Sequence, residues 1–173
     1  MNHRHASHHH VAALTVSLLL AAVSLTVPSC SDNSCYDNGS SLPKAECYVD
    51  GAKQSISGLT IKGIGAPGDS LLADSSSISE IYLPLRASVG TTSYELHRWV
   101  QIDDVRGIAY DTLTIDYEPI VYFHSTECGA MYNFKIKKVS CTSNAIDSVT
   151  VLTPTVTNSL RAALRIHFTD FDQ

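Results

Sequence analysis

The sequence carries little charge and no excess of positive charge. Charged residues make up 17% of its 173 residues, and 17 acidic side chains outnumber 12 basic ones, for a formal net charge of −5. Proteins that bind nucleic acid need clustered Lys and Arg side chains, so we expect no nucleic-acid partner. The chain is not of the disordered class either, because 44% of its residues are hydrophobic.

Motifs that mark common enzymes and metal sites are also lacking. The sequence has no Gly-x-Ser-x-Gly, no His-Glu-x-x-His and no glycine-rich phosphate loop. After residue 30 it keeps three histidines, His97, His124 and His167, and no two of them stand at the spacing of metal ligands. Its aspartates lack the order of a calcium-binding loop. We therefore expect no catalytic residue, no metal site and no cofactor.

Helical periodicity is absent beyond the N-terminal region, and a period of two replaces it. Apolar and polar residues alternate as they do in half-buried strands. The alternation predicts strands at residues 81–85, 94–100, 113–118, 132–137, 148–151 and 164–168. Pro84 removes a ladder donor and places the first of them at a sheet edge. Six or more short strands predict an all-β protein, an antiparallel two-sheet β-sandwich of immunoglobulin-like outline.

The single long apolar run lies at the N-terminus. Residues 1–10 contain Arg4 and no acid, and residues 11–27 contain no charge at all. A basic start, an apolar middle and small residues before a cleavage site are typical of a secretory signal peptide. A retained anchor helix is the alternative, but the run ends without the positive cluster that stops transfer. We predict that residues 1–29 are a cleaved signal peptide.

The end of this run resembles a bacterial lipobox. Val27-Pro28-Ser29-Cys30 would leave an acylated Cys30 as the new first residue, and Ser31 is similar to the residue that sends lipoproteins to the outer membrane. Two or more acyl chains, such as palmitate, anchor a protein stably. Residues 30–43 are then a lipidated tether and residues 44–173 the β-sandwich domain, in a mature chain of net charge −6.

Five cysteines leave four once Cys30 is lipidated, and we expect disulfides in an oxidising compartment. A strand over residues 131–137, about 20 Å long, stands between Cys128 and Cys141, and the few residues at its ends would have to double straight back to join them. This disfavours a Cys128–Cys141 bridge, and the pairing of Cys35 with Cys47 falls with it. Two long-range pairings remain: Cys35–Cys128 with Cys47–Cys141, or Cys35–Cys141 with Cys47–Cys128. Four free thiols are the other alternative.

Several segments resemble uncharacterised Bacteroidota-type lipoproteins with a domain of unknown function. Glu127-Cys128-Gly129 and Ala145-Ile146-Asp147-Ser148-Val149 are the most specific. The remaining matching segments are residues 59–71, 81–85, 111–114, 130–132 and 166–168. The resemblance implies a secreted, lipidated, β-rich domain with an outer-membrane β-barrel protein as partner. It also implies a family bridge Cys35–Cys128, with Cys47 and Cys141 as an extra pair.

Two functions are therefore expected, in order. The first is a non-catalytic outer-membrane lipoprotein, lipid-anchored through Cys30, that binds or scaffolds another envelope protein. The alternative is a surface glycan-binding protein that uses exposed aromatic residues, with Trp99 stacking on the sugar and with Tyr110 and Phe171 beside it.

Overall fold

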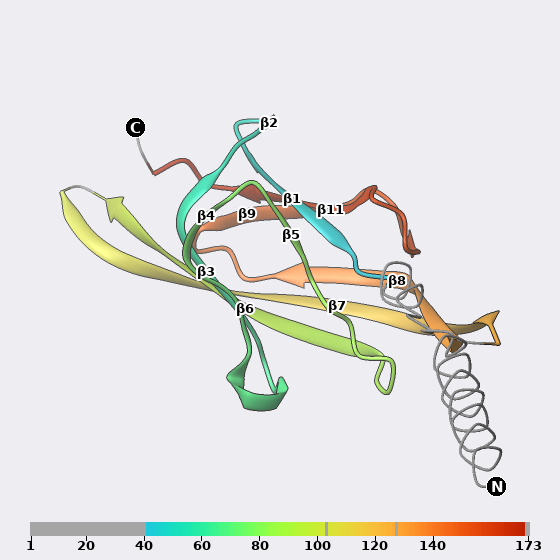
Figure 1. Cartoon of the computed structure of the whole chain (residues 1–173). Coiled ribbons are helices and arrows are strands. Elements are labelled where there is room, and N and C mark those ends of the chain that lie inside the picture. The colour runs from blue at the N-terminus through green and yellow to red at the C-terminus, as the bar shows by residue number, and fades with distance from the viewer. Residues whose placement is uncertain (1–40, 103, 127, 172–173) are drawn as a thin grey trace, which may run out of the picture. The chain divides into compact units, whose positions relative to one another are not determined.

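The computed structural model describes residues 41–102, 104–126 and 128–171. The chain divides into two compact units, Met1–Asn33 and Ser34–Gln173. The second unit contains all the described residues and is nearly all β, whereas the predicted signal peptide and the lipidation site Cys30 lie outside the described residues. Two sheets face each other, as the alternation predicts, and form a β-sandwich (Figure 1).

One sheet has five strands, four of which come from the two ends of the domain. Its order is β2 (Ala52–Lys53), β1 (Lys44–Val49), β11 (Ala162–Phe168) and β9 (Ile146–Val151), and β5 (Glu80–Tyr82) also pairs with β1. The pairing of β1 with β11 is parallel, with Cys47 opposite Ile166, while the other pairings are antiparallel. The predicted antiparallel sandwich therefore contains one parallel pair at its centre.

The other sheet has six strands from the middle of the chain. Its order is β10 (Thr155–Val156), β8 (Gly129–Cys141), β7 (Val105–Ser125), β6 (Thr91–Ile102), β3 (Ile56–Gly63) and β4 (Leu71–Ile78). A short 3-10 turn, η1 (Pro67–Asp69), stands between β3 and β4. All pairings in this sheet are antiparallel.

The core lies between the two sheets and is made by alternate residues of their strands. Ala45, Cys47 and Val49 of β1 are buried, and their neighbours in the strand are less so. Burial of each Leu, Ile or Val side chain contributes about 1.5–3 kcal/mol. The core cluster contains Ile56, Leu59, Ile61, Ile78, Leu83, Tyr94, Leu96, Leu113, Ile115, Tyr117, Phe134, Ile136, Ile146, Val156, Ala163, Leu164, Ile166 and Phe168.

All six predicted strands occur, with different ends. The strand predicted at 81–85 is β5, which ends at Tyr82, before Pro84. It pairs with β1 alone and therefore lies at a sheet edge, so the edge position predicted from Pro84 is confirmed. The strand predicted at 113–118 is the centre of β7, which runs for 21 residues.

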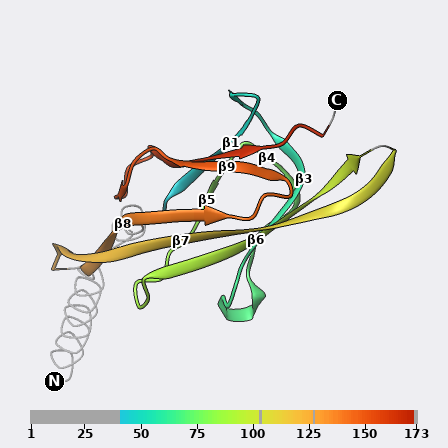
Figure 2. The ribbon, with the colours of Figure 1, turned by 180° about the vertical axis from the view of Figure 1, so that it is seen from behind.

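The length of β7 carries it beyond the sandwich at both ends (Figures 1 and 2). At one end it forms a hairpin with β6, which pairs Ile102 with Val105 at its tip. At the other it forms a hairpin with β8, which pairs Ser125 with Gly129. Side chains on a two-stranded projection are not covered by a second sheet, so these two hairpin ends present exposed surfaces to which a ligand or a partner could bind. None of the helical segments in the described ranges is long and apolar enough to cross a membrane.

Candidate functional site

The projecting β6–β7 hairpin has one face of aromatic and apolar side chains. Trp99 lies opposite Ile108 and His97 lies opposite Tyr110, and residues directly opposite in an antiparallel pair share a face. Trp99 is 48% exposed and Tyr110 is 53% exposed. The His97 and Tyr110 rings are 5.1 Å apart between centroids. The structure thus brings Trp99 and Tyr110 to the same face, as the platform predicted from the sequence requires.

Arg106 lies over Trp99. Its guanidinium carbon is 4.7 Å from the centroid of the indole ring, an arrangement that attracts a cation to the ring face. One face of the indole is therefore covered by a charged group. An aromatic ring with a cation beside it suits a ligand that is both flat and anionic better than a neutral one.

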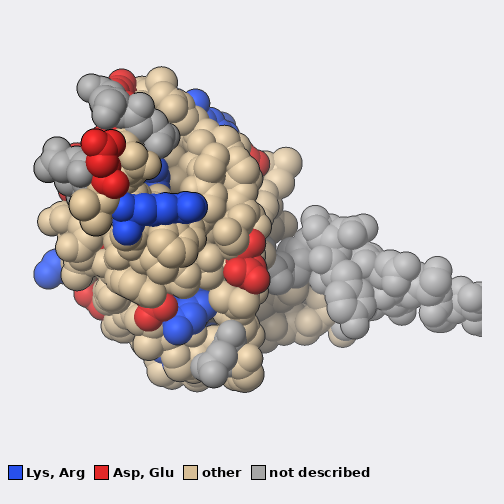
Figure 3. All heavy atoms as spheres, turned by 90° about the vertical axis from the view of Figure 1, so that its left-hand side faces the viewer, with Lys and Arg blue, Asp and Glu red and all other residues tan. Residues whose placement is uncertain are grey.

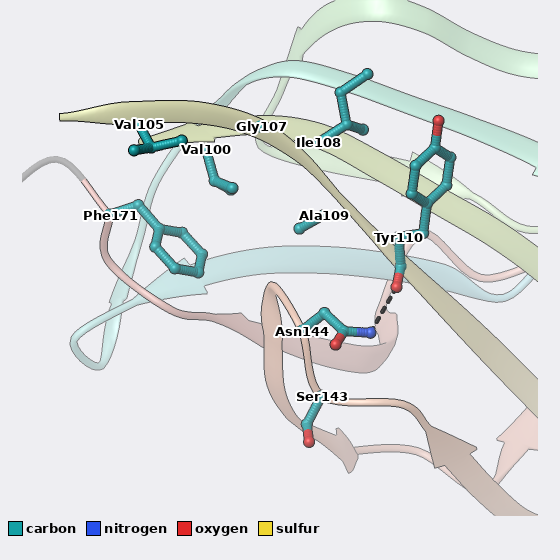
Figure 4. A pocket seen from close by; sticks show the side chains of 9 residues that line it. All are labelled: Val100, Val105, Gly107, Ile108, Ala109, Tyr110, Ser143, Asn144 and Phe171. Carbon is teal, nitrogen blue, oxygen red and sulfur yellow. Dashed lines mark hydrogen bonds between the residues drawn. The ribbon is translucent and has the colours of Figure 1, made fainter. Parts of the chain in front are cut away.

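Phe171 does not join this platform, so that part of the prediction is wrong. Along β6, Arg98 and Val100 point to the face opposite Trp99, because successive side chains of a strand alternate. The Arg98 guanidinium lies 5.6 Å from the Phe171 ring centroid. Phe171 and Val100 line an open pocket of about 650 Å³ under the hairpin (Figure 4). Asn144 closes its far side with a hydrogen bond from Nδ2 to the Tyr110 carbonyl, 2.7 Å long.

Asp111 is a buried carboxylate on β7, 3% exposed, that holds the connection between the two sheets. Its Oδ2 accepts hydrogen bonds from the backbone N–H groups of Ala145, at 2.7 Å, and Ile146, at 2.9 Å. Its Oδ1 accepts from the Thr142 hydroxyl, at 2.7 Å, and from the Asn144 backbone, at 2.8 Å. Burial alone would raise the pKa of Asp111, but these hydrogen bonds together outweigh it and hold the pKa below its usual value.

Two of the segments that resemble the lipoprotein family thereby meet in space. Residues 111–114 supply the carboxylate, and residues 145–149 supply N–H groups that it binds. Buried charge that is fully hydrogen-bonded specifies a loop conformation. These segments therefore have a structural role in the described domain.

The other projecting end, the β7–β8 hairpin, exposes an apolar face. Val121 lies opposite Tyr132, and Phe123 lies opposite Ala130. Val121 is 61%, Phe123 69% and Tyr132 42% exposed. They continue the face of β7 that is buried at Tyr117, where the second sheet no longer covers it. Single exposed apolar side chains are ordinary, whereas a contiguous group marks an interaction surface.

The cysteines correct one predicted bridge. Cys47 is buried in β1, Cys141 is partly buried at the end of β8, and both are free cysteines, so the predicted Cys47–Cys141 pair is wrong. The two residues lie on different sheets. Because both are free, the pairing of Cys35 with Cys141 and of Cys47 with Cys128 is wrong as well. Cys128 is not among the free cysteines, and its predicted partner Cys35 lies outside the described residues.

The histidines are spread over the domain. The His167 ring lies 5.8 Å from Tyr48 on the five-stranded sheet, and the His124 ring lies 6.1 Å from Tyr122 on the β7–β8 hairpin. Within the ranges that the structure covers, no three His, Cys, Asp or Glu side chains gather at metal-binding distance.

Two important residues escaped prediction from the sequence. Arg98 occupies an apolar register position between Leu96 and Val100, and it is 7% exposed. Asp111 stands two residues before Leu113, so its side chain lies on the face of β7 that is buried in the core. The sequence does show a charged residue at a strand position whose neighbours in the alternation are apolar. Both Arg98 and Asp111 occupy such a position.

The comparisons with known proteins give one match. The sequence model of a family of unknown function, DUF6452, matches residues 58–168. Neither a curated protein nor a solved structure matches significantly.

Proposed function

The chain belongs to the DUF6452 family of unknown function, and from that premise we propose that it is a non-catalytic lipoprotein of the outer membrane that binds an envelope protein. The acylated residue is Cys30, and the lineage is of the Bacteroidota type. The proposal rests on the lipobox-like Val27-Pro28-Ser29-Cys30 and on the preceding apolar run.

The observation that carries the binding role is the exposed apolar face of the β7–β8 hairpin. Val121 and Phe123 are more than half exposed on a two-stranded projection, where each adds apolar area that a partner would bury. A free-standing ribbon without such a partner would keep this area in water. An integral outer-membrane protein, such as a β-barrel, is the partner whose chemistry fits an apolar face held near lipid.

A disulfide between Cys35 and Cys128 would hold this hairpin near the membrane. Cys128 adjoins the tip of the hairpin, since β7 ends at Ser125 and β8 begins at Gly129. Five steps from Cys30 to Cys35 span at most about 18 Å. The bridge would therefore confine the hairpin tip to within one short tether of the lipid, on the side where the partner lies.

Site-specific cross-linking tests the proposal. A photoreactive amino acid at Phe123 should capture an integral outer-membrane protein from intact cells. The matched control is the same amino acid at Leu160, which is 78% exposed but lies outside the hairpin. A protein captured equally from both positions, or no integral protein from position 123, would contradict the proposed interface.

A second candidate function is glycan binding. The observation that favours it is the exposure of Trp99 and Tyr110 on one face of the β6–β7 hairpin. Aromatic faces stack on sugar rings, and Trp is the strongest such platform. A glycan array that gives a signal with the wild type and none with Trp99→Ala would support this function over the first, and a silent array would remove it.

A further inference from the structure

A second pocket, of about 390 Å³, lies beside Trp99. It occurs where β3 separates from β6: the two strands pair only from Thr60 to Gly63, and β6 continues to Ile102 without β3 beside it. The freed space is lined by the turn before β3, by Ser75 of β4 and by Thr169 after β11. The volume falls within the range of small-molecule sites.

Arg98 is the unusual residue of this pocket. Its side chain is more than nine-tenths buried, and its Nε has no hydrogen-bond partner. None of the ion pairs between described residues includes Arg98. The Phe171 ring covers its guanidinium at 5.6 Å, which offsets only part of the cost of burying a charge. The positive charge of a buried guanidinium that lacks a carboxylate partner would be neutralised by a bound anion.

The lining as a whole, Arg98 included, is mostly polar and holds two basic side chains against one acidic one. Arg106 adds a second guanidinium, and Asp170 adds a single carboxylate. This local balance differs from that of the whole chain, which is acidic. Gln54, Ser55 and Ser57 supply short side chains that donate and accept hydrogen bonds. In the view onto the β6–β7 end of the domain, basic and acidic side chains lie side by side on a mostly uncharged surface (Figure 3).

We propose that this pocket binds a carboxylated sugar, a uronic acid unit of an acidic polysaccharide. The carboxylate would pair with the Arg98 guanidinium, whose planar fork matches it. Arg98 and Trp99 point to opposite faces of β6, but both line the pocket at the edge of β6 that β3 leaves free. A sugar at this edge would reach the Trp99 ring, and its hydroxyl groups would exchange hydrogen bonds with the serines. A peptide is the poorer ligand, because few apolar side chains line the pocket to receive its own. The proposal rests on the glycan-binding function and names its class of ligand. It does not depend on the protein interface proposed for the β7–β8 hairpin.

Trp99 is the sole tryptophan of the chain, so its fluorescence reports directly on the pocket. Full-length protein in detergent is titrated with trigalacturonate, with neutral galactotriose as the matched sugar, and the affinity is confirmed by calorimetry. We expect saturable binding of trigalacturonate alone. Arg98→Met should weaken it at least tenfold. Arg165→Met is the control, because Arg165 also lies over a ring, Tyr48, at 4.1 Å and also has an unpartnered Nε, but lies outside the pocket.

Thermal melts accompany each titration. Methionine replaces an unpaired buried charge by an apolar chain of similar length, so Arg98→Met should keep the melting temperature of the wild type. If that variant unfolds, Arg106→Gln, on the exposed side of the pocket, should still weaken binding several-fold. Equal affinity in all variants, no binding of trigalacturonate, or tighter binding of a glutamate-rich peptide would each overturn the proposal. Cross-linking at Phe123 would be unaffected by any of these results.

Discussion

A single carboxylate, Asp111, joins the six-stranded sheet to the loop that leads into the five-stranded one. In Asp111→Asn an NH2 group replaces one carboxylate oxygen. Either the N–H groups of Ala145 and Ile146 or the Thr142 hydroxyl and the Asn144 N–H then lose their acceptor. A buried donor without a partner costs about 1–3 kcal/mol. We expect the variant to lose about 3 kcal/mol of unfolding free energy in urea denaturation at pH 7. Asp116→Asn, on the same strand but near the surface, should lose less than 1 kcal/mol.

The same carboxylate makes stability depend on pH. The pKa of Asp111 is lower in the folded chain than in the unfolded one. Its stabilisation is therefore complete above the unfolded pKa, about 3.9, and is lost as the pH falls through the folded pKa. The difference in stability between wild type and Asp111→Asn should shrink in denaturation curves measured from pH 5 down to pH 2. A constant difference over that range would show that the charge is not what the loop binds.

The two free thiols should differ sharply in reactivity. Burial raises the pKa of Cys47 to about 12, and nearby Lys53 lowers it only in part. Burial also raises the pKa of Cys141, which is more accessible. Since the thiolate is the reactive form, iodoacetamide at pH 8 should label Cys141 slowly and Cys47 not at all in the native protein. After unfolding without reductant, both should be labelled. A Cys47–Cys141 peptide in the mass spectrum would contradict this.

At the scale of elements, β7 combines a covered centre with two uncovered ends. Residues 111–117 alternate into the core, whereas residues 105–109 and 120–125 belong to two-stranded projections. Backbone hydrogen bonds of such ribbons open more readily than those of a packed sheet. In native-state hydrogen exchange we expect the amides of Leu113 and Ile115 to exchange at least a hundredfold more slowly than those of Ile108 and Val121. Uniform protection along β7 would mean that a further element covers both ends.

For the molecule as a whole, the membrane anchor is the feature to test. Labelled palmitate should enter the wild type and be absent from Cys30→Ala, which should run as uncleaved precursor. Cys35→Ala is the control, because it removes a neighbouring cysteine and leaves the predicted acylation site intact. Equal labelling of wild type and Cys30→Ala would end the lipoprotein hypothesis and leave the fold unaffected.

Strand alternation predicted the class of fold because one face of each long strand is buried. Five strands escaped it. Two of them, β2 and β10, have only two residues each, and the other three escaped for identifiable reasons. β1 alternates, but through Ala45 and Cys47, which are weak apolar signals. In β3, Gly58 adopts a φ of 65°, and in β4, Ser75 adopts a φ of 43°; both interrupt the period of two.

The candidate pocket could be predicted only in part. Trp99 and Arg98 are adjacent in sequence, and the position of Arg98 among apolar register residues marks it. Their partners come from the turn before β3, from β4 and from the segment after β11, which meet only in the folded chain. Without a known motif, the spacing of residues in the sequence does not predict which distant segments meet in the folded chain.

The parallel pairing of β1 with β11 has a consequence for the order of folding. Lys44 pairs with Ala162, so the domain closes on a contact between its earliest and latest strands. Such high contact order slows folding, because a long loop must close before the contact is made. A chain emerging from the ribosome cannot complete this sheet until Phe168 has been made. Until then β1 lacks its main partner strand and the five-stranded sheet is incomplete, which would suit the secretion that we propose for this chain.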